Sequence, residues 1–244
     1  MSDFQQFEAE NLRSVEAMAR DAELHRLTQA WWERATAHRY SYHFRWMGVP
    51  IIQFPQDIVA MQELLWEVKP DLVIETGVAR GGSVVFYASM LELIGGDGRV
   101  VGVDIDIRPH NRAAIETHRM APRIHLIQGS SIDPQIVAQV RELARRHQRI
   151  LVVLDSNHTH DHVLQELELY SRFVTPGSYL VVFDTRIEHT PPELIGQRPW
   201  RKGDNPWTAV QAFLRRSDRF VVDMSVVDRL QITVCPDGFL KCVK

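Results

Sequence analysis

The chain has 244 residues, 45% of them hydrophobic, so it is long enough to bury the core of one domain. Its formal net charge of −3, from 28 Lys and Arg against 31 Asp and Glu, leaves no cationic surplus for a nucleic-acid partner. The cysteines, Cys235 and Cys242, are expected to be reduced, and without a cationic leader or 18 consecutive apolar residues we expect a soluble, cytoplasmic protein with no membrane partner.

The N-terminal part is predicted to be helical. Apolar residues recur at loose helical spacing from Phe4 to about His38, without glycine or proline. The next segment, YSYHFRWMGVPIIQFPQD, has too many prolines for a long element and is too apolar for a free linker. We therefore divide the chain into a helical extension that covers the substrate side, residues 1–56, and a main domain, residues 57–244. The helices and aromatic residues of the extension favour a homo-oligomer.

A regular alternation of helices and strands begins at residue 57. The segment DIVAMQELLWEV predicts a helix with Asp57 as its N-cap, and continuous Val, Ile and Leu runs then alternate with amphipathic helices. This pattern is typical of a doubly wound α/β domain, whose mostly parallel sheet is covered on both faces. The predicted strands are DLVIET, RVVGVDID, RIHLIQGSS, RILVVLDS and SYLVVFDT.

The pattern changes after Asp184. A proline-rich loop, RIEHTPPELIGQRPWRKGDNP, precedes a helix over WTAVQAFLRR. Three further segments, FVVDM, LQITVCP and FLKCV, are predicted as strands. Their short connections indicate an antiparallel C-terminal hairpin that closes one edge of the sheet.

Polar residues gather where the predicted strands end, which is where open α/β sheets bind ligands. In VIETGVARGGS, Gly77 permits a tight turn, while Gly81 and Gly82 permit close approach of a ligand. The spacing is neither G-x-G-x-x-G nor a P-loop, and Glu75 would repel a phosphate and attract an ammonium group. Asp104, at the end of the next strand, suits ribose hydroxyls, so the combination favours S-adenosylmethionine. The alternative is that the glycines serve only the turn and Asp104 caps a helix.

A second group of acids follows two later strands. Asp155 and Asp184 end apolar strands that we expect to be neighbours, so their side chains should converge. Two buried carboxylates repel each other unless a cation or proton joins them, and Mg²⁺ suits oxygen ligands. His158 would lie beside the metal and take a proton from a substrate hydroxyl. The alternatives are that the acids cap helices, or that zinc binds His158, His160 and His162, although their directions diverge.

Several motifs are specific in combination: VIETGVARGGS, VVGVDIDIR, LVVLDSNHTHDHVLQELELY, GSYLVVFDT and the tail GDNPWTAVQAFL with PDGFLK. They resemble the cephalosporin hydroxylase family of class I S-adenosylmethionine-dependent methyltransferases, which also contains rhamnosyl and macrolide-sugar O-methyltransferases. The resemblance runs from about Tyr40 to the C-terminus, and GVPIIQFPQDIVAMQELLW is among its most telling segments. It implies a Rossmann-like fold with a seven-stranded sheet and a Mg²⁺ site.

The resemblance also implies a role for each matching position. His158 matches the general base, and Asp155 is expected to serve the metal, the cofactor and the catalytic step. Relatives often carry two adjacent acids after the fifth strand, whereas this chain has Phe183 and Asp184, so Thr185 is expected to replace the missing metal ligand. The cofactor positions are Glu75, Thr76, Gly77, Gly81 and Ser83 in the loop, Asp104 at the ribose, and Ser130 and Ser131 on the adenine side.

The predicted activity is Mg²⁺-dependent transfer of a methyl group from S-adenosylmethionine to a hydroxyl of a small molecule, a sugar or a glycosylated secondary metabolite. Substrate selectivity is expected in the variable segments Tyr40 to Phe54 and Arg186 to Asn205. Two alternatives remain open. One is a non-catalytic cofactor-binding protein that assists a hydroxylase, and the other is an NAD-dependent sugar enzyme, against which the missing G-x-G-x-x-G argues.

Overall fold

A seven-stranded sheet forms the centre of the molecule in the computed structural model, which describes residues 2–244. Its strands are β3 (Leu72–Thr76), β4 (Arg99–Asp104), β5 (Ile124–Gln128), β6 (Ile150–Leu154), β7 (Tyr179–Val182), β8 (Phe220–Val222) and β9 (Phe239–Cys242). They lie in the order β5-β4-β3-β6-β7-β9-β8, with β9 antiparallel to both of its neighbours and the other pairs parallel. The prediction of a doubly wound, mostly parallel seven-stranded sheet is confirmed.

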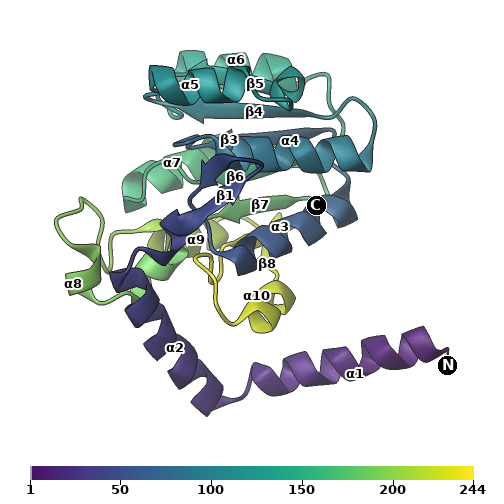
Figure 1. Cartoon of the computed structure of the whole chain (residues 1–244), viewed down its shortest axis with the longest axis vertical. Helices are drawn as coiled ribbons and strands as arrows, with labels where there is room; N and C mark the ends of the chain where they lie inside the picture. The colour runs from purple at the N-terminus through teal and green to yellow at the C-terminus, as the bar shows by residue number, and fades with distance from the viewer. Residues whose placement is uncertain (1) are drawn as a thin grey trace.

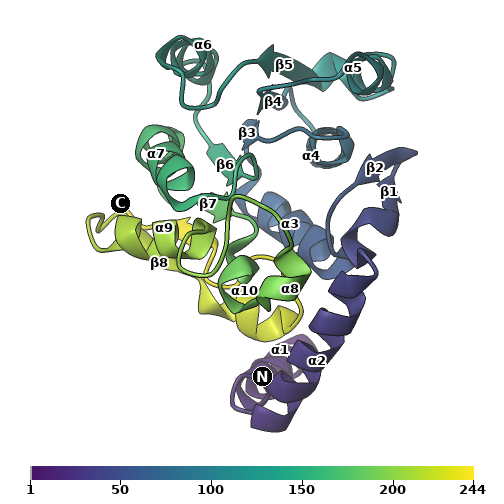
Figure 2. The same cartoon turned by 90° about the vertical axis from the view of Figure 1, so that its left-hand side faces the viewer.

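Helices cover both faces of the sheet (Figure 2). One face carries α6 (Pro134–Ala144), α7 (His160–Tyr170) and α9 (Pro206–Leu214), and the other carries α3 (Pro55–Val68), α4 (Gly82–Ile94) and α5 (Pro109–Glu116). Strand side chains alternate between the two hydrophobic cores, with Val73 in one and Ile74 in the other. Both faces of the sheet are therefore buried, which explains the continuous apolar runs in the sequence.

The last strand pair departs from its prediction. Phe220–Val222 and Phe239–Cys242 do pair antiparallel, but α10 (Met224–Leu230) lies within their connection. Residues 231–238 form bends and a turn, so the strand predicted over LQITVCP is wrong. The alternating pattern of this segment reflects contacts with a distant helix, because Thr233 and Val234 both bond to Asp57 of α3.

The start of α3 also differs from its prediction. The helix begins at Pro55 with Phe54 as N-cap, and Asp57 lies in the first turn, fully buried. The Thr233 hydroxyl donates to Asp57 Oδ1, and the Val234 amide donates to Oδ2 at 3.0 Å. Burial raises the pKa of Asp57 to about 7, against its ordinary 3.8. Asp57 thus joins α3 to the segment before β9.

The N-terminal residues form two helices, α1 (Asp3–Met18) and α2 (Ala22–Ala37), in agreement with the predicted helical extension. Asp21 ends the break between them, because its carboxylate accepts from the Leu24 amide at 2.9 Å and caps α2. Figure 1 shows α1 lying apart from the sheet, next to α10 (Met224–Leu230), and α2 running back toward the sheet. Among residues 2–244, none of the helices has the length and apolar character that crossing a membrane requires.

The aromatic segment after α2 folds onto α4, which agrees with the prediction that it covers another element. It forms a two-stranded antiparallel sheet, β1 (Phe44–Trp46) and β2 (Val49–Ile51). The Trp46 indole N–H donates to Ser89 Oγ of α4 at 2.9 Å. The remaining short helices are η1 (Tyr40–His43), η2 (Ala121–Arg123), η3 (Ser171–Phe173), η4 (Thr185–His189) and α8 (Pro192–Ile195).

Candidate active site

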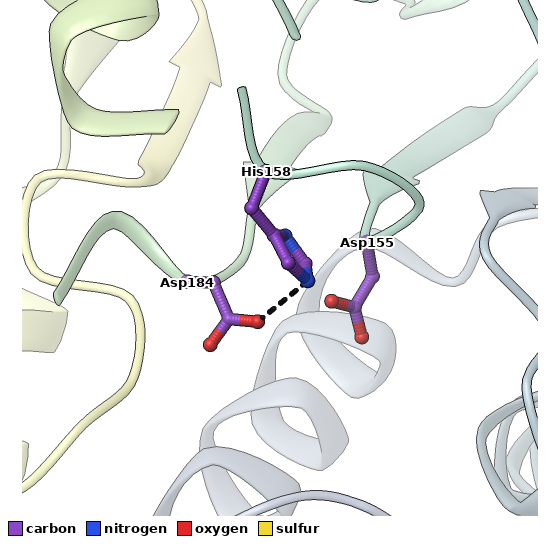
Figure 3. A group of neighbouring side chains, drawn as sticks. All are labelled: Asp155, His158 and Asp184. Atoms are coloured by element: carbon purple, nitrogen blue, oxygen red, sulfur yellow. Dashed lines mark ion pairs between the residues drawn. The ribbon is translucent and has the colours of Figure 1, made fainter. Parts of the chain in front are cut away.

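Acidic side chains meet where β6 and β7 end. Asp155 follows β6, Asp184 follows β7, and His158 lies in the loop between β6 and α7. One ligand atom from each of these three residues lies within 4.8 Å of the others, and Figure 3 shows their side chains pointing toward one another. The structure therefore brings together the two acids and the imidazole that were predicted to act together.

The imidazole of His158 is held from two sides. Its Nε2 lies 3.1 Å from Asp184 Oδ2, and its ring meets the Trp200 ring edge-on, with centroids 4.6 Å apart. Asp184 has a left-handed backbone, with φ of 58°, and it turns the chain from β7 into η4. Aspartate tolerates this conformation better than most residues. The acid thus shapes the turn and orients the histidine.

Asp155 is a partly buried acid among other acids. Burial raises the pKa of Asp155 well above its usual range, and the charge of Asp184 raises it further. A divalent cation would relieve this repulsion, and two carboxylates provide the hard oxygen ligands that Mg²⁺ prefers. The residues present fit a Mg²⁺ site on Asp155 and Asp184, with His158 beside it.

Gln53 is a site residue that sequence reasoning misses. Its Nε2 donates to Asp155 Oδ2 at 3.2 Å, its side chain is buried, and its Oε1 has no hydrogen-bond partner. The available signal is a lone amide within the apolar stretch IIQF, where an unpaired polar group would be costly. Gln53 therefore orients the acid from the segment that precedes α3.

Thr185 does not take the position expected for a metal ligand. Its side chain is fully buried, and its hydroxyl donates to the Pro236 carbonyl. It does not line the cavity beside Asp155 and Asp184. The buried ring of Phe183 lines that cavity at the position where relatives often carry the additional acid. The role expected for Thr185 has no support in this structure.

The glycines after β3 serve contacts within the chain. A Cβ on Gly77, whose φ is +93°, would stand 2.0 Å from the Asp155 carbonyl oxygen. A Cβ on Gly82 would stand 2.3 Å from the Pro50 carbonyl oxygen, and one on Gly81 would stand 2.5 Å from the Ile115 side chain. The expectation that Gly81 and Gly82 leave space for a ligand is therefore corrected: in this structure that space holds β2 and α5.

Glu75 lies beneath the loop, without exposure to the cavity. Its side chain is fully buried, and its Oε2 accepts from Ser83 Oγ at 2.7 Å. Burial raises the pKa of Glu75 to about 8, so the acid is mostly neutral near pH 7. This corrects the expectation that Glu75 presents a charge to a ligand ammonium. Thr76 is also fully buried, and Ser83 is the second residue of α4.

Asp104 joins the end of β4 to the same loop. Its Oδ2 accepts from the amides of Val78 at 2.9 Å and Ala79 at 3.0 Å, and its Oδ1 accepts from the Asp106 amide at 2.9 Å. A carboxylate oxygen can accept two hydrogen bonds, so Oδ1 retains capacity for a ligand hydroxyl. Asp104 is also partly exposed, which keeps it a suitable ribose-binding acid.

Ser131 lies in a polar cluster with α7. Its hydroxyl is 3.1 Å from His162 Nε2, and that nitrogen is 3.3 Å from Ser156 Oγ. Ser156 Oγ donates to Glu166 Oε1 at 2.7 Å, and Glu166 is fully buried. Ser130 precedes this cluster and is partly exposed. His162 therefore points toward the predicted adenine side, away from a zinc site with His158.

A cavity of about 220 Å³ opens beside the acidic pair. Its walls come from the end of α2, the segment before α3, and the loop that contains η4 and α8. Both segments predicted to set substrate selectivity thus contribute residues to one cavity. The residues that line the cavity include Trp32, Arg39, Tyr42, Gln53, Phe54, Asp155, Asp184, Arg186, Arg198, Trp200 and Val234.

Comparison with known proteins identifies the family. Residues 38–243 match the family described as Rhamnosyl O-methyltransferase/CmcI. The chain belongs to this family. Rhamnosyl O-methyltransferase of Mycobacterium leprae (strain TN) is 33% identical over 197 residues, which are 80% of this chain and 81% of that protein. Its counterpart in Mycobacterium tuberculosis (strain ATCC 25618 / H37Rv) is 32% identical, over 80% of this chain and 76% of its own.

Two solved structures of other proteins share this fold. CmcI with Mg and SAM has a TM-score of 0.58 and 19% identity, over 83% of this chain and 78% of that one. An O-methyltransferase from Bacillus cereus in complex with SAH has a TM-score of 0.52 and 14% identity, over 80% of this chain and 81% of its own. At these identities the likeness concerns the fold, and it agrees with the strand order described above.

Proposed function

We propose that the protein is an S-adenosylmethionine-dependent and Mg²⁺-dependent O-methyltransferase, and that its acceptor is a sugar hydroxyl. Membership of the Rhamnosyl O-methyltransferase/CmcI family supports the reaction class, because the named relatives are rhamnosyl O-methyltransferases. The observation that carries the proposal is the convergence of Asp155, His158 and Asp184 at the carboxyl edge of the sheet. Two acids and an imidazole beside a cavity provide both a metal site and a base.

We assign the cofactor to the loop after β3. Asp104 would hold the ribose through Oδ1, and Ser130 and Ser131 would adjoin the adenine. Glu75 acts from beneath, because it fixes Ser83 at the start of α4 through a 2.7 Å hydrogen bond. Structures of CmcI, which shares the fold, are described with Mg-SAM and with SAH. They support the proposal that this chain also binds S-adenosylmethionine and Mg²⁺.

His158 acts as the general base. As the acceptor oxygen bonds to the methyl carbon, the His158 imidazole takes the hydroxyl proton, and the carbon–sulfur bond breaks to leave S-adenosylhomocysteine. The carboxylate of Asp184, whose Oδ2 lies 3.1 Å from Nε2, stabilises the positive charge of the imidazolium that results. Bound Mg²⁺ would lower the pKa of the hydroxyl and help to orient it. Asp155 and Asp184 would hold the metal, while Gln53 keeps Asp155 in place.

A His158→Ala variant tests this assignment. We expect it to bind S-adenosylhomocysteine and Mg²⁺ as the parent chain does, and to lose about 10²- to 10⁴-fold of its turnover. Calorimetric titration measures binding, and transfer of a labelled methyl group to a rhamnoside panel measures turnover. A parent chain that binds NAD but not S-adenosylhomocysteine would contradict the proposal. Full turnover in the variant would remove His158 from the mechanism.

We further propose that the protein self-associates through α1. None of the residues in Asp3–Met18 is buried, and Phe4, Phe7 and Leu12 are 69%, 56% and 60% exposed. An amphipathic helix held away from the sheet is suited to pair with a second copy. Light scattering should give a mass above 28.2 kDa, and a Phe7→Ser variant should lower it.

Residues 1–56 are proposed to form the substrate-side cover of a main domain over residues 57–244. Trp32, Arg39, Tyr42 and Phe54 support this division, because they bring one wall of the cavity from the N-terminal part. We place the protein in the cytoplasm, in agreement with two buried free cysteines. Removal of residues 1–56 should open the cavity and abolish acceptor binding, as measured by calorimetry.

A further inference from the structure

Three arginine side chains line the cavity, and none of them pairs with a carboxylate. Arg39 comes from the turn between α2 and η1, Arg186 from η4 and Arg198 from the loop after α8. Ion pairs within 4.0 Å elsewhere in residues 2–244 do not include these three guanidinium groups. The cavity wall therefore carries three guanidinium groups that have no ion-pair partner within 4.0 Å among the described acids.

Arg186 is the most deeply placed of the three. Its guanidinium lies 5.0 Å over the Trp32 ring, its Nη2 donates to Gln29, and its buried Nε has no hydrogen-bond partner. Arg186 is half-buried, and its buried, unpaired Nε–H is costly unless an acceptor such as an anion reaches it.

Arg123 shows how this chain satisfies a buried guanidinium elsewhere. Its side chain is only 16% exposed, and it pairs with Glu92 at 2.6 Å. Its other donors reach the carbonyls of Gly98 at 2.8 Å and Gly96 at 2.9 Å. Arg186 makes a single side-chain hydrogen bond, to Gln29, and lacks the carboxylate and carbonyl partners that Arg123 has.

The other two guanidinium groups are held on aromatic rings. Arg39 lies 4.3 Å over Tyr42, and Arg198 lies 5.3 Å over Trp200. Both arginines are exposed at the cavity wall, so their donors remain free for a ligand. The Trp200 ring also contacts His158, which places Arg198 one ring away from the base.

The charges in the cavity favour an anion. Asp155 and Asp184 are the acids in its wall, and they adjoin His158 and form the candidate Mg²⁺ site. A divalent cation on this pair would neutralise both acids of the cavity wall, and the three arginines would then be its remaining charged groups. Arginine binds carboxylate and phosphate oxygens through paired donors, which gives both affinity and orientation.

We propose that the acceptor is an acidic sugar, whose carboxylate or phosphate binds Arg39, Arg186 and Arg198 while a hydroxyl of the same molecule faces His158. This inference rests on the proposed function and narrows its substrate class. The anionic group fixes the sugar in the cavity, and the aromatic rings of Tyr42 and Trp200 provide faces for the sugar ring. Uronates and sugar phosphates share this chemistry.

Matched probes test the inference. Calorimetric titration compares methyl glucuronide with methyl glucoside, which differ only at C6, and glucose 1-phosphate with glucose, each with and without S-adenosylhomocysteine and Mg²⁺. We expect the anionic member of at least one pair to bind about tenfold more tightly. Arg198→Gln should reduce that preference by about tenfold, whereas Arg201→Gln, an exposed residue of the same loop outside the cavity wall, should preserve it.

The outcomes separate the two proposals. Tighter binding of the glucuronide assigns a carboxylate to the acceptor, and tighter binding of the sugar phosphate assigns a phosphate. Equal binding of charged and neutral probes, no binding of either anion, or an anion preference that survives in the Arg39→Gln, Arg198→Gln double variant overturns the acidic acceptor. Failure of S-adenosylhomocysteine to bind overturns the proposed function instead, and the titrations without cofactor still measure the anion preference.

Discussion

Replacing Gly77 by alanine should disturb the active site through its backbone. Gly77 follows β3 and packs directly against the carbonyl of Asp155, a proposed metal ligand at the end of β6. A Cβ there would stand 2.0 Å from that oxygen and 2.4 Å from its carbon. Gly177 provides the matched control, because its φ of +82° is equally unfavourable for alanine but no atom lies within 4 Å of its added Cβ.

The magnitude follows from these two positions. Alanine with a left-handed backbone costs about 1–2 kcal/mol at either glycine. At Gly77 the clash must also be relieved, because non-bonded carbon atoms pack at about 3.5–4.0 Å, and overpacking adds about 1–3 kcal/mol. We therefore expect Gly77→Ala to lose about 2–5 kcal/mol of unfolding free energy, against about 1–2 kcal/mol for Gly177→Ala. Displacing Asp155 by about 1 Å should lower turnover by about 100-fold.

Urea unfolding measures the free energies, and methyl transfer with titrated Mg²⁺ measures the effect on the site. Gly177→Ala should keep the parent turnover, since Gly177 lies before β7, at the opposite edge from Asp184. Equal losses of stability in the two variants would refute the reasoning. Normal Mg²⁺ affinity in Gly77→Ala would likewise show that the contact does not position Asp155.

Two further predictions concern buried polar side chains. The folded-state pKa of Asp57, about 7, lies above its ordinary 3.8, so its stabilising effect is present below about pH 4 and is lost as the pH rises toward 7. This change corresponds to at most about 4 kcal/mol of unfolding free energy. Between about pH 4.5 and 8, the unfolding free energy measured with urea should therefore fall less in Asp57→Asn than in the parent chain. Equal falls in the two proteins would contradict this prediction. Gln53→Leu removes a side-chain donor to Asp155 and should weaken Mg²⁺ binding about 10- to 100-fold while S-adenosylhomocysteine affinity is kept; unchanged Mg²⁺ affinity would show that Gln53 does not orient the acid.

Residue periodicity was sufficient for the parallel part of the fold. Strands buried on both faces give continuous apolar runs, and covering helices give amphipathic ones, so local pattern and final structure agree. Asp155 and Asp184 could be predicted together because both follow such strands. The strand prediction for LQITVCP was wrong because its alternating apolar and polar residues match a strand pattern. In the structure Asp57, far away in the chain, holds Thr233 and Val234 in an irregular segment.

Site details that depend on distant contacts were not predictable from local sequence. A glycine pattern does not reveal whether a ligand or another chain segment occupies the space, and at Gly82 the neighbour is Pro50. Glu75 looks like an exposed acid after a strand, yet packing beneath α4 makes it a buried hydrogen-bond acceptor. From the sequence, Thr185 could be taken for an additional metal ligand, but its hydroxyl donates a hydrogen bond to the Pro236 carbonyl.

The link between Asp57 and Val234 bears on how the protein reaches its native state. It joins residues 177 positions apart. Val234 itself and Phe54, which precedes Asp57 in the chain, both line the cavity. Contacts of such long range carry a large entropic cost of loop closure and generally form late. The cavity wall is therefore expected to assemble after the sheet has nucleated, and to be among the regions where hydrogen exchange is fastest.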